Sequence, residues 1–567
     1  MSICGCRSLL RAASLLFVTV PLIAADSVTG PHGMVVAQEP LAADVGLGVL
    51  KSGGNAIDAA VAVGFALAVT HPLAGNIGGG GFMMIRLANG ESHFLDFRET
   101  APSSATRDMY LNTEGKPTEE SVAGWRASGI PGTVAGLEMA SKRFGTKRWN
   151  ELLTPAIRLA AEGFTVDATL AHQLTTSQKF LSQDPESKLL FLRNGRVYRP
   201  GDTFKQPELA SVLERISKNG ARELYAGEVG RRFAAEMKKH GGSITAADLI
   251  NYTALDRAPL EGAYHDYHLI CAPPPSAGGI GILQMLAMLS GTDYASDGPD
   301  SPKAVHYMAE AMRRFYADRS EYLGDPRYYK VPTVELLSPT YIERRRQSIS
   351  AEKATPSNEV KPGLVSSSVA DLGDEEAGET THFNVVDAKG NAVAVTYTLN
   401  GAFGSGVSVP GLGFLLNNEM DDFVVKPGFP NMFGLVGGVA NSIEPGKRPL
   451  SSMSPTIITT NGKLFMVVGA PGGSQITTGV TQVILDVIDF HMNVQDAVDL
   501  PRFHHQWKPD FLYLKNGFSG QAESALSKMG YNVRHTDAVA RVEAIVVRGT
   551  QLEGGTESHL NGKVAAY

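Results

Sequence analysis

A polar segment that ends abruptly at a β-hairpin constrains the fold of this chain more than any other feature. Residues 344–379 contain no aromatic side chain and are rich in Ser, Glu, Lys and Pro, a composition that cannot bury enough apolar surface to become ordered. From Thr381 the pattern changes to alternating β-formers, with THFNVV, the turn DAKGN and AVAVTYTL. The sequence therefore predicts a flexible tether that runs directly into two antiparallel strands joined by a Gly-containing turn.

The predicted hairpin brings two threonines together at its open end. If Val386 pairs with Ala392 across the turn, the same register puts Thr380 opposite Thr398, within hydrogen-bonding reach of its hydroxyl. By itself this is most simply an ordinary cross-strand pair. A cut directly before Thr380 changes its chemistry, because the freed α-amino group can serve as the base that activates the adjacent hydroxyl.

The first 25 residues have the pattern of an export signal. Arg7 and Arg11 precede an apolar stretch, residues 12–25, which ends in the small pair Ala24-Ala25. These are the basic, apolar and cleavage regions of a secretory signal peptide, and a transmembrane anchor needs a longer apolar run. We therefore expect a signal peptide at residues 1–25 and a periplasmic or secreted product without a membrane span.

Composition limits what the mature chain does. The 567 residues are 43% hydrophobic and 19% charged, as in soluble globular proteins. A formal net charge of −7 gives no support to a nucleic-acid partner, which calls for a basic excess. Because Cys4 and Cys6 lie in the signal, Cys271 is left alone, and we expect no intrachain disulfide in the mature chain.

A glycine-rich run and a pair of histidines are more simply interpreted as structural features than as binding sites. Residues 75–81 are glycine-rich, but they follow a helical stretch and precede a strand-like one, the reverse of a dinucleotide-binding turn. His504 and His505 are adjacent, so in regular structure they point in different directions and make a poor metal chelate. No Walker A, Gly-x-Ser-x-Gly or zinc-type Cys/His spacing is present.

Ten motifs, spread in order along the mature chain, make the sequence recognisable. The first four are GGNAIDAAVA, HPLAGNIGGGGF, DFRETAP and IPGTVAG, at 53–62, 71–82, 96–102 and 130–136. The other six are ETTH (379–382), VTYTLN (395–400), LLNNEMDDF (415–423), GKRPLSSMSPT (446–456), GAPGGS (469–474) and PRFHHQW (501–507). In these motifs the chain resembles the γ-glutamyltranspeptidase family over essentially its whole mature length.

The resemblance implies an α+β fold, the αββα four-layer sandwich of the N-terminal nucleophile (Ntn) hydrolases. Members of this family are made as inactive precursors that cleave themselves. In this chain the resemblance places the cut between Glu379 and Thr380. It leaves a large subunit of residues 26–379, which includes the tether, and a small catalytic subunit of residues 380–567, the two forming a heterodimer.

The same resemblance implies the chemistry of the site. Thr380 is expected to be the nucleophile, with its own amine as base and Thr398 orienting its hydroxyl. The backbone amides of Gly472 and Gly473 match the oxyanion hole, where glycine lets the N–H groups come close to the developing charge. The expected donors are γ-glutamyl compounds such as glutathione, and the expected acceptors are water, amino acids and peptides. This chemistry requires no metal and no organic cofactor.

A γ-glutamyl group carries an α-carboxylate and an α-ammonium, so its pocket needs charges of both signs. Arg98 matches the family's arginine for the carboxylate, which a guanidinium binds through two parallel hydrogen bonds. The remaining matches are Ser451 and Ser452 for the carboxylate, and Asn400, Glu419 and Asp422 for the ammonium.

The chain departs from the family pattern in two places. Residues 426–438 match the lid loop that covers the pocket in some bacterial members, but Phe433 stands where a gating tyrosine is often found. A phenyl ring covers a pocket without donating a hydrogen bond, so we expect the lid to lack that latch. Farther along, GGTESH at 554–559 departs from the family's usual acidic-Arg pattern.

Two alternatives stay open. One is an acylase of the same fold that takes glutaryl side chains, as the related cephalosporin acylases do. A glutaryl group lacks the α-ammonium, so Asp422 would face it as an unpaired charge, which argues against this reading. The other is an exported binding protein that stays uncleaved, against which the intact Thr380 and Thr398 argue. A denaturing gel separates these hypotheses, because the uncleaved binding protein would give one band and the self-cleaving enzymes would give two.

Overall fold

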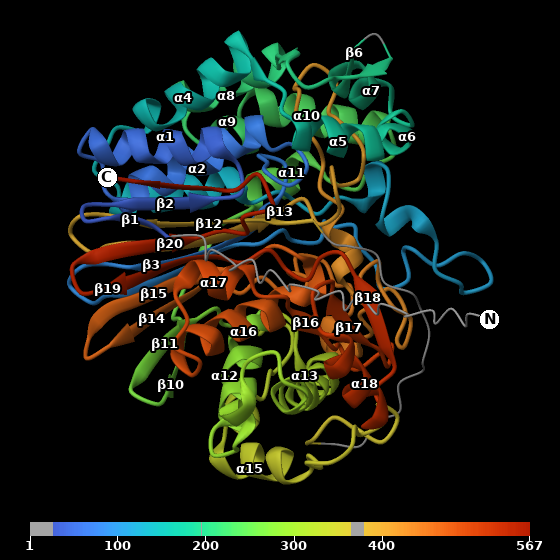
Figure 1. Ribbon diagram of the computed structural model, residues 1–567. Helices are drawn as coiled ribbons and strands as arrows, with labels where there is room; N and C mark the ends of the chain where they lie inside the picture. Colours follow the sequence, from blue (N-terminus) through green and yellow to red (C-terminus); the bar gives the residue numbers. More distant parts are fainter. Residues whose placement is uncertain (1–26, 194, 365–378) are drawn as a thin grey trace, which may run out of the picture.

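Two seven-stranded antiparallel sheets, stacked face to face, form the centre of the molecule (Figure 1). The computed structural model describes residues 27–193, 195–364 and 379–567. The predicted signal, residues 1–25, therefore lies outside the described residues. Helices cover the outer face of each sheet, which confirms the expected αββα four-layer sandwich.

Each sheet combines strands from distant parts of the chain. The first sheet runs in the order β1 (Val28–Gly30), β20 (Gln551–Gly555), β19 (Glu543–Arg548), β15 (Lys463–Gly469), β14 (Thr456–Thr460), β11 (Tyr267–Cys271) and β10 (Leu260–Tyr264). The second runs in the order β21 (Lys563–Ala566), β2 (Met34–Ala37), β12 (Thr381–Val386), β13 (Ala392–Thr398), β3 (Gly80–Arg86), β4 (Ser92–Phe97) and β9 (Leu255–Arg257).

The hairpin of β12 and β13 lies at the middle of the second sheet. Val386 pairs with Ala392 and Thr381 with Tyr397, which confirms the register predicted from the sequence. Every residue of both strands is buried, because the first sheet packs on one face of the hairpin and helices pack on the other. Rigid structure on all sides therefore fixes the residues at the open end of the hairpin.

Helices α1 (Pro40–Lys51) and α2 (Ala56–Thr70) cover the outer face of the second sheet (Figure 1). α2 begins after Asn55, whose side chain accepts a hydrogen bond from the backbone N–H of Asp58 while Asp58 accepts one from Asn55. All 15 residues of α2 are buried between the sheet and other helices. This burial explains the alanine-rich sequence of α2.

Further helices extend this layer and form the outer part of the molecule above it. They are α3 (Thr133–Phe144), α4 (Trp149–Glu162), α5 (Ala168–Thr176), α6 (Gln178–Leu181), α7 (Pro185–Phe191), α8 (Pro207–Asn219), α9 (Arg222–Tyr225), α10 (Glu228–Lys239) and α11 (Ala246–Asn251). Two short strand pairs lie among them, β5 (Phe164–Thr165) with β8 (Thr203–Phe204) and β6 (Leu192–Arg193) with β7 (Arg196–Val197).

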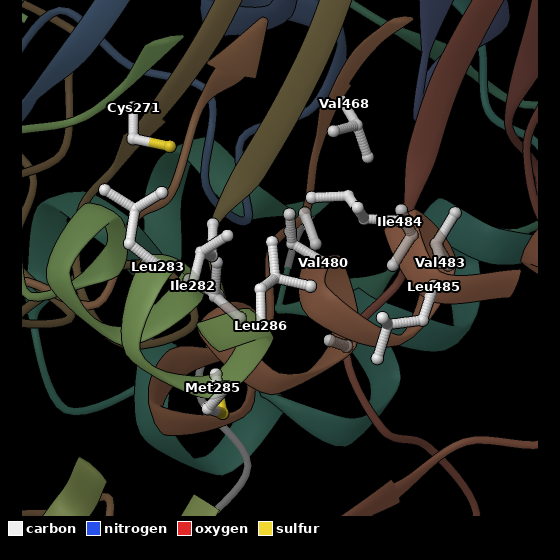
Figure 2. Packing of buried hydrophobic residues seen from close by; sticks show 14 of the residues in the cluster. Cys271, Ile282, Leu283, Met285, Leu286, Val468, Val480, Val483, Ile484 and Leu485 are labelled. Atoms are coloured by element: carbon white, nitrogen blue, oxygen red, sulfur yellow. The ribbon is translucent and has the colours of Figure 1, made fainter. Parts of the chain in front are cut away.

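Helices α12 (Gly278–Leu289) and α16 (Ile476–Ile488) pack under the first sheet. Figure 2 shows Leu286 of α12 and Val480 of α16 pointing toward each other below Val468 of β15. The same layer and its surroundings hold α13 (Pro302–Tyr322), α14 (Thr333–Leu336), α15 (Pro339–Gln347), α17 (Val494–Asp499), α18 (Gly520–Lys528) and a small sheet of β16 (Phe503–His504), β17 (Leu512–Lys515) and β18 (Val533–Thr536).

The prediction of a flexible tether is wrong for its first part, residues 344–364. These residues complete α15 and then pack along the molecule. The indole N–H of Trp507 donates to the carbonyls of Ser357 and Val360, at 2.8 and 3.0 Å, and the Thr355 hydroxyl donates to Glu310. Polar contacts with groups of other elements, together with the burial of Val360, thus order a segment that brings little apolar surface of its own. Residues 365–378 lie outside the described residues.

Two further observations bear on the class of protein. Within residues 27–193, 195–364 and 379–567, no helix is long and apolar enough to cross a membrane. Cys271 is a free, buried thiol at the end of β11, and burial raises the pKa of this thiol to about 12. Cys271 therefore stays protonated and packs as a small apolar residue.

Candidate functional site

The predicted threonine pair lies at the open end of the central hairpin. Thr380 immediately precedes β12 and Thr398 is the last residue of β13, with both side chains buried. The Thr380 hydroxyl donates to the Thr398 hydroxyl at 3.4 Å, and the Thr398 hydroxyl donates to the carbonyl oxygen of Glu379 at 3.0 Å. The backbone N–H of Asn400 donates to the same Thr398 oxygen at 2.7 Å.

These contacts fix the direction of each hydroxyl proton. Because the Asn400 amide and the Thr380 hydroxyl both donate to Thr398, the single Thr398 proton is free to point at the carbonyl of Glu379. The Thr398 hydroxyl therefore polarises the carbonyl that precedes Thr380 and accepts the hydrogen bond of the Thr380 hydroxyl. This arrangement suits attack by the Thr380 oxygen on that carbonyl carbon.

Gly472 and Gly473 stand at the N-terminal end of α16. Their φ angles are 127° and 55°, a region that favours glycine, and a Cβ on Gly472 would come within 2.9 Å of the Cα of Ala540. Neither amide N–H has a hydrogen-bond partner within the described part of the chain. Both N–H groups are thus free to bind a developing oxyanion, and Gly473 lines the pocket that contains Thr380.

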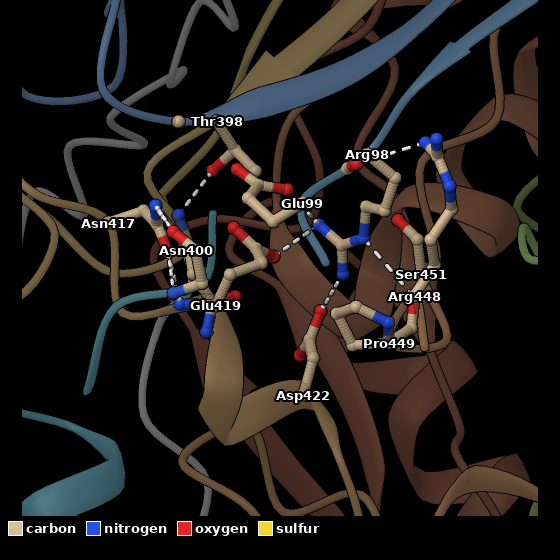
Figure 3. Close-up of polar contacts among 12 residues, drawn as sticks. Arg98, Glu99, Thr398, Asn400, Asn417, Glu419, Asp422, Arg448, Pro449 and Ser451 are labelled. Carbon is tan, nitrogen blue, oxygen red and sulfur yellow. Dashed lines mark hydrogen bonds and ion pairs between the residues drawn. The ribbon is translucent and has the colours of Figure 1, made fainter. Parts of the chain in front are cut away.

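Arg98 is surrounded by carboxylates. It follows β4, and Figure 3 shows its guanidinium between Glu419 and Asp422, to each of which it forms a short ion pair. Glu99 lies 3.6 Å from the same guanidinium, and two backbone carbonyls accept from it at 3.3 Å each. The arginine expected to bind the substrate carboxylate thus pairs with the acids expected to bind the substrate ammonium.

The charges of this cluster are shifted by burial and by one another. Burial lowers the pKa of Arg98, but the carboxylates of Glu419, Asp422 and Glu99 more than offset this and hold the pKa above its usual value. Burial raises the pKa of Glu99 to about 7, against the opposing effect of Arg98. Burial also raises the pKa of Glu419, with Glu99 adding to the shift. Burial thus shifts the pKa of both Glu99 and Glu419 upward, despite the neighbouring guanidinium.

The structure brings the predicted site residues to one pocket. Asn400 has a positive φ of 83°, and its amide donates to the carbonyl of Asn418 at 3.1 Å. Two predicted residues do not line this pocket, namely Glu379, on the bond that is expected to be cut, and Gly472, which is adjacent to the lining residue Gly473. The predicted residues that line it are Arg98, Thr380, Thr398, Asn400, Glu419, Asp422, Phe433, Ser451, Ser452 and Gly473.

Phe433 and Leu435 of the predicted lid line this pocket. Phe433 is buried against it, and Gln506 donates to the Phe433 carbonyl at 3.0 Å. The neighbouring Met432 brings its sulfur to 3.8 Å from the Asn400 amide, and its N–H donates to Asp421 at 2.9 Å. The free volume beside Thr380 is about 20 Å³, enough for about one water molecule.

Several residues that hold the site were not predicted from the sequence. Glu99 is one, although its place beside Arg98 in DFRETAP was a signal. Asn417 is another, because its amide accepts from Gly129 and Glu419 and so fixes the segment that carries the acids. Arg319 of α13 places its guanidinium 3.5 Å from the Ser452 hydroxyl, and no motif in the sequence pointed to it.

The adjacent histidines are structural, as predicted. His504 hydrogen bonds to Thr478 and Gln506, at 2.8 and 2.9 Å, and His505 lies 3.2 Å from Asp510. Burial lowers the pKa of His504 to about 3 and that of His505 to about 4, so both rings are neutral at physiological pH.

Comparisons with known proteins show which proteins the chain is similar to. The sequence model of the family described as Gamma-glutamyltranspeptidase matches residues 42–567. The chain is 48% identical over 522 residues to the "Glutathione hydrolase proenzyme" of Escherichia coli (strain K12), covering 92% of this chain and 89% of the relative.

Two solved structures resemble the fold. The cephalosporin acylase of Bacillus halodurans superimposes with a TM-score of 0.84 at 28% identity, over 99% of both chains. The gamma-glutamyltranspeptidase of Helicobacter pylori gives a TM-score of 0.57 at 44% identity, over 57% of this chain and 94% of that chain. The family match covers nearly the whole chain, and on this basis the chain belongs to the gamma-glutamyltranspeptidase family.

Proposed function

We propose that this chain is the precursor of an exported γ-glutamyltransferase and glutathione hydrolase that cleaves itself between Glu379 and Thr380. The observation that carries the proposal is the hydrogen-bonded chain from the Thr380 hydroxyl through Thr398 to the Glu379 carbonyl. The Thr380 oxygen attacks the carbonyl carbon, the C–N bond breaks, and the nitrogen takes up the hydroxyl proton. Water then hydrolyses the resulting ester, which leaves a carboxylate on Glu379 and restores the Thr380 hydroxyl.

In the mature enzyme the same oxygen acts on the substrate. The free amine of Thr380 accepts the hydroxyl proton while the oxygen attacks the γ-carbonyl, and the amides of Gly472 and Gly473 stabilise the oxyanion. The leaving amine takes the proton, and a γ-glutamyl ester remains on Thr380. Water resolves the ester in hydrolysis, and the amine of an amino acid or peptide resolves it in transfer.

The charges of the pocket support a zwitterionic substrate. Arg98 suits the α-carboxylate, and Glu419 and Asp422 suit the α-ammonium. When the substrate binds, its two charges replace the pairs that these side chains make with one another. A glutaryl group brings a carboxylate without an ammonium, so it would leave buried acids unpaired, which costs free energy. This favours γ-glutamyl donors over the substrates of the acylases with the same fold.

The test compares two anilides that differ only in the α-ammonium, a γ-glutamyl anilide and a glutaryl anilide. We expect kcat/KM to be about 10- to 100-fold higher for the γ-glutamyl compound, because the glutaryl compound lacks the charge-assisted hydrogen bond of the α-ammonium. Asp422→Asn is expected to narrow this preference, and Asp44→Asn, at an exposed surface ion pair, is the matched control. A glutaryl anilide that is cleaved as fast or faster refutes this assignment.

Export and assembly complete the proposal. The pattern of residues 1–25 supports passage through a membrane to the periplasm or the medium, and the purified protein is expected to lack these residues. The large and small subunits are expected to stay together as a heterodimer after the cut. N-terminal sequencing of both bands of the purified protein checks both expectations.

A further inference from the structure

Arg319 is a buried cation beside the pocket that contains Thr380, and it takes no part in the chemistry proposed above. It belongs to α13, and only 6% of its surface is exposed. Its guanidinium donates to the Ser452 hydroxyl at 3.5 Å. Its Nε is buried without a hydrogen-bond partner, and no residue that the structure describes forms an ion pair with it. Because an unpaired buried charge is costly, this guanidinium indicates that an anion binds nearby.

The charges of the two arginines at this pocket are balanced differently. Nearby carboxylates hold the pKa of Arg98 above its usual value. Burial lowers the pKa of Arg319, and the nearby Tyr316 and Asp422 offset this effect only in part. A guanidinium keeps its proton in proteins even so. The positive charge that lacks a carboxylate partner is therefore that of Arg319.

The hydroxyl groups of Ser451 and Ser452 are oriented in the same way. The Ser451 oxygen accepts from the backbone N–H of Met453 at 3.1 Å, and the Ser452 oxygen accepts from Arg319. Among the described residues, neither hydroxyl has an acceptor for its own proton. Both protons are thus free for a ligand while the oxygens are held in place. Both serines line the same pocket as Arg98, so this ligand lies beside the Arg98 guanidinium.

A carboxylate that enters this pocket meets more negative than positive charge if Arg98 is the only cation. Glu99, Glu419 and Asp422 all lie within 3.6 Å of the Arg98 guanidinium. Each ionised acid repels an incoming carboxylate, and the repulsion is strong where water is excluded. A second guanidinium close to the serines offsets part of this repulsion, and Arg319 has the position and the free charge for it.

We propose that Arg319 is a positioning residue for the α-carboxylate of the γ-glutamyl donor. It holds the Ser452 oxygen, so that the Ser452 proton points to the carboxylate, and its charge favours a carboxylate over a neutral group at this place. The inference rests on the proposed function and deepens it, because it adds a residue that selects donors by their α-carboxylate.

The experiment compares two anilides that differ only in the α-carboxylate, a γ-glutamyl anilide and a γ-aminobutyryl anilide. Arg319→Met is expected to raise KM for the γ-glutamyl compound about tenfold with little change in kcat, because the contact is the same in the ground state and the transition state. For the γ-aminobutyryl compound, which brings no carboxylate, kcat/KM is expected to change less than about twofold. Arg319→Lys, which keeps the charge, is expected to recover part of the affinity.

A double-mutant cycle tests whether Arg319 acts through Ser452. Ser452→Ala is also expected to raise KM for the γ-glutamyl anilide about tenfold. The loss in the double variant is expected to be clearly smaller than the product of the two single losses, because each change removes the same contact. Losses that multiply overturn a role through Ser452.

Controls separate this role from an effect on folding. Arg215→Met removes an arginine from a partly exposed ion pair with Glu223 on the outer helices, and it is expected to leave both anilides unaffected. If Arg319→Met gives no mature protein, Arg319→Lys takes its place, with a rise in KM confined to the γ-glutamyl compound. An unchanged KM, or an equal loss for both anilides, overturns the role of Arg319. A wild-type protein that does not cleave the γ-glutamyl anilide overturns the proposed function instead.

Discussion

One hydroxyl connects the two chemical steps proposed for this chain. Thr398 accepts hydrogen bonds from Thr380 and from the Asn400 amide, and it donates to the Glu379 carbonyl. Thr398→Val removes the hydroxyl at constant shape, so we expect self-cleavage to slow by about 10- to 100-fold. Thr398→Ser, which keeps the donor, is the control. The fraction of intact precursor over time measures the effect, and a Thr398→Val chain that matures at the wild-type rate excludes this role.

A second prediction concerns pH and Glu99. Burial raises the pKa of Glu99 from 4.5 to about 7. Within this window the folded chain keeps a proton that the unfolded chain has lost, so the free energy of unfolding falls as the pH rises. Glu99→Gln cannot ionise and is expected to flatten that part of the profile.

The measurement is urea unfolding at acidic, neutral and mildly alkaline pH, in an uncleaved Thr380→Ala background so that a single chain unfolds. The Glu99→Gln chain is expected to gain stability relative to its parent as the pH rises. Parallel profiles for the two proteins rule out a buried, titrating Glu99.

Some contacts between residues of the site could be predicted from the sequence and others could not. The alternating pattern of residues 381–398 and the turn within it were enough to predict that Thr380 lies opposite Thr398, because the pairing of strands in a hairpin is a local property. The pairing of Arg98 with Glu419 and Asp422 was not predictable. It depends on how segments more than 300 residues apart meet, and on which groups remain near each other without a ligand.

At the scale of elements, the predicted lid is the part that is expected to move. Residues 426–438 bring Phe433 to the wall of the pocket and the Met432 sulfur to 3.8 Å from the Asn400 amide, and little free volume remains beside Thr380. Phe433→Tyr adds a hydrogen-bond donor at nearly constant volume. We expect it to alter the partition between hydrolysis and transfer, because a latched lid limits the access of water and bulky acceptors to the acyl-enzyme.

The product ratio against acceptor concentration, measured for both proteins, tests this prediction. Self-cleavage is expected to remain intact in Phe433→Tyr, which serves as an internal control for folding. Identical ratios mean that Phe433 does not gate the site.

Among the elements, the sequence predicted one helix well and one segment wrongly. The buried helix at 56–70 was predictable, since a nearly uncharged apolar run with a clear cap has few other uses. That residues 344–364 are ordered could not be predicted. The composition of a segment shows only its own apolar surface, and not the partners that other elements provide. Here Trp507, Glu310 and Asp510 supply the partners from other elements.

On the scale of the whole molecule, both sheets mix strands of the two predicted subunits. Strands β12 and β13 of the small subunit are hydrogen bonded between β2 and β3 of the large one, and β14 pairs with β11. The proposed cut after Glu379 would leave all these pairings in place. We therefore expect the fragments to elute together as one species of the summed mass in size-exclusion chromatography and to separate only under denaturing conditions. Fragments that part in native buffer contradict this prediction.

The central claim is that Thr380 cuts the chain at its own amino side and is then the nucleophile. The most direct measurement is the N-terminal sequence and the number of bands of wild type and Thr380→Ala, purified in parallel. The account predicts two bands for wild type, the smaller beginning Thr-Thr-His-Phe, and one uncleaved, inactive chain for Thr380→Ala. A Thr380→Ala chain still cut between residues 379 and 380 contradicts it.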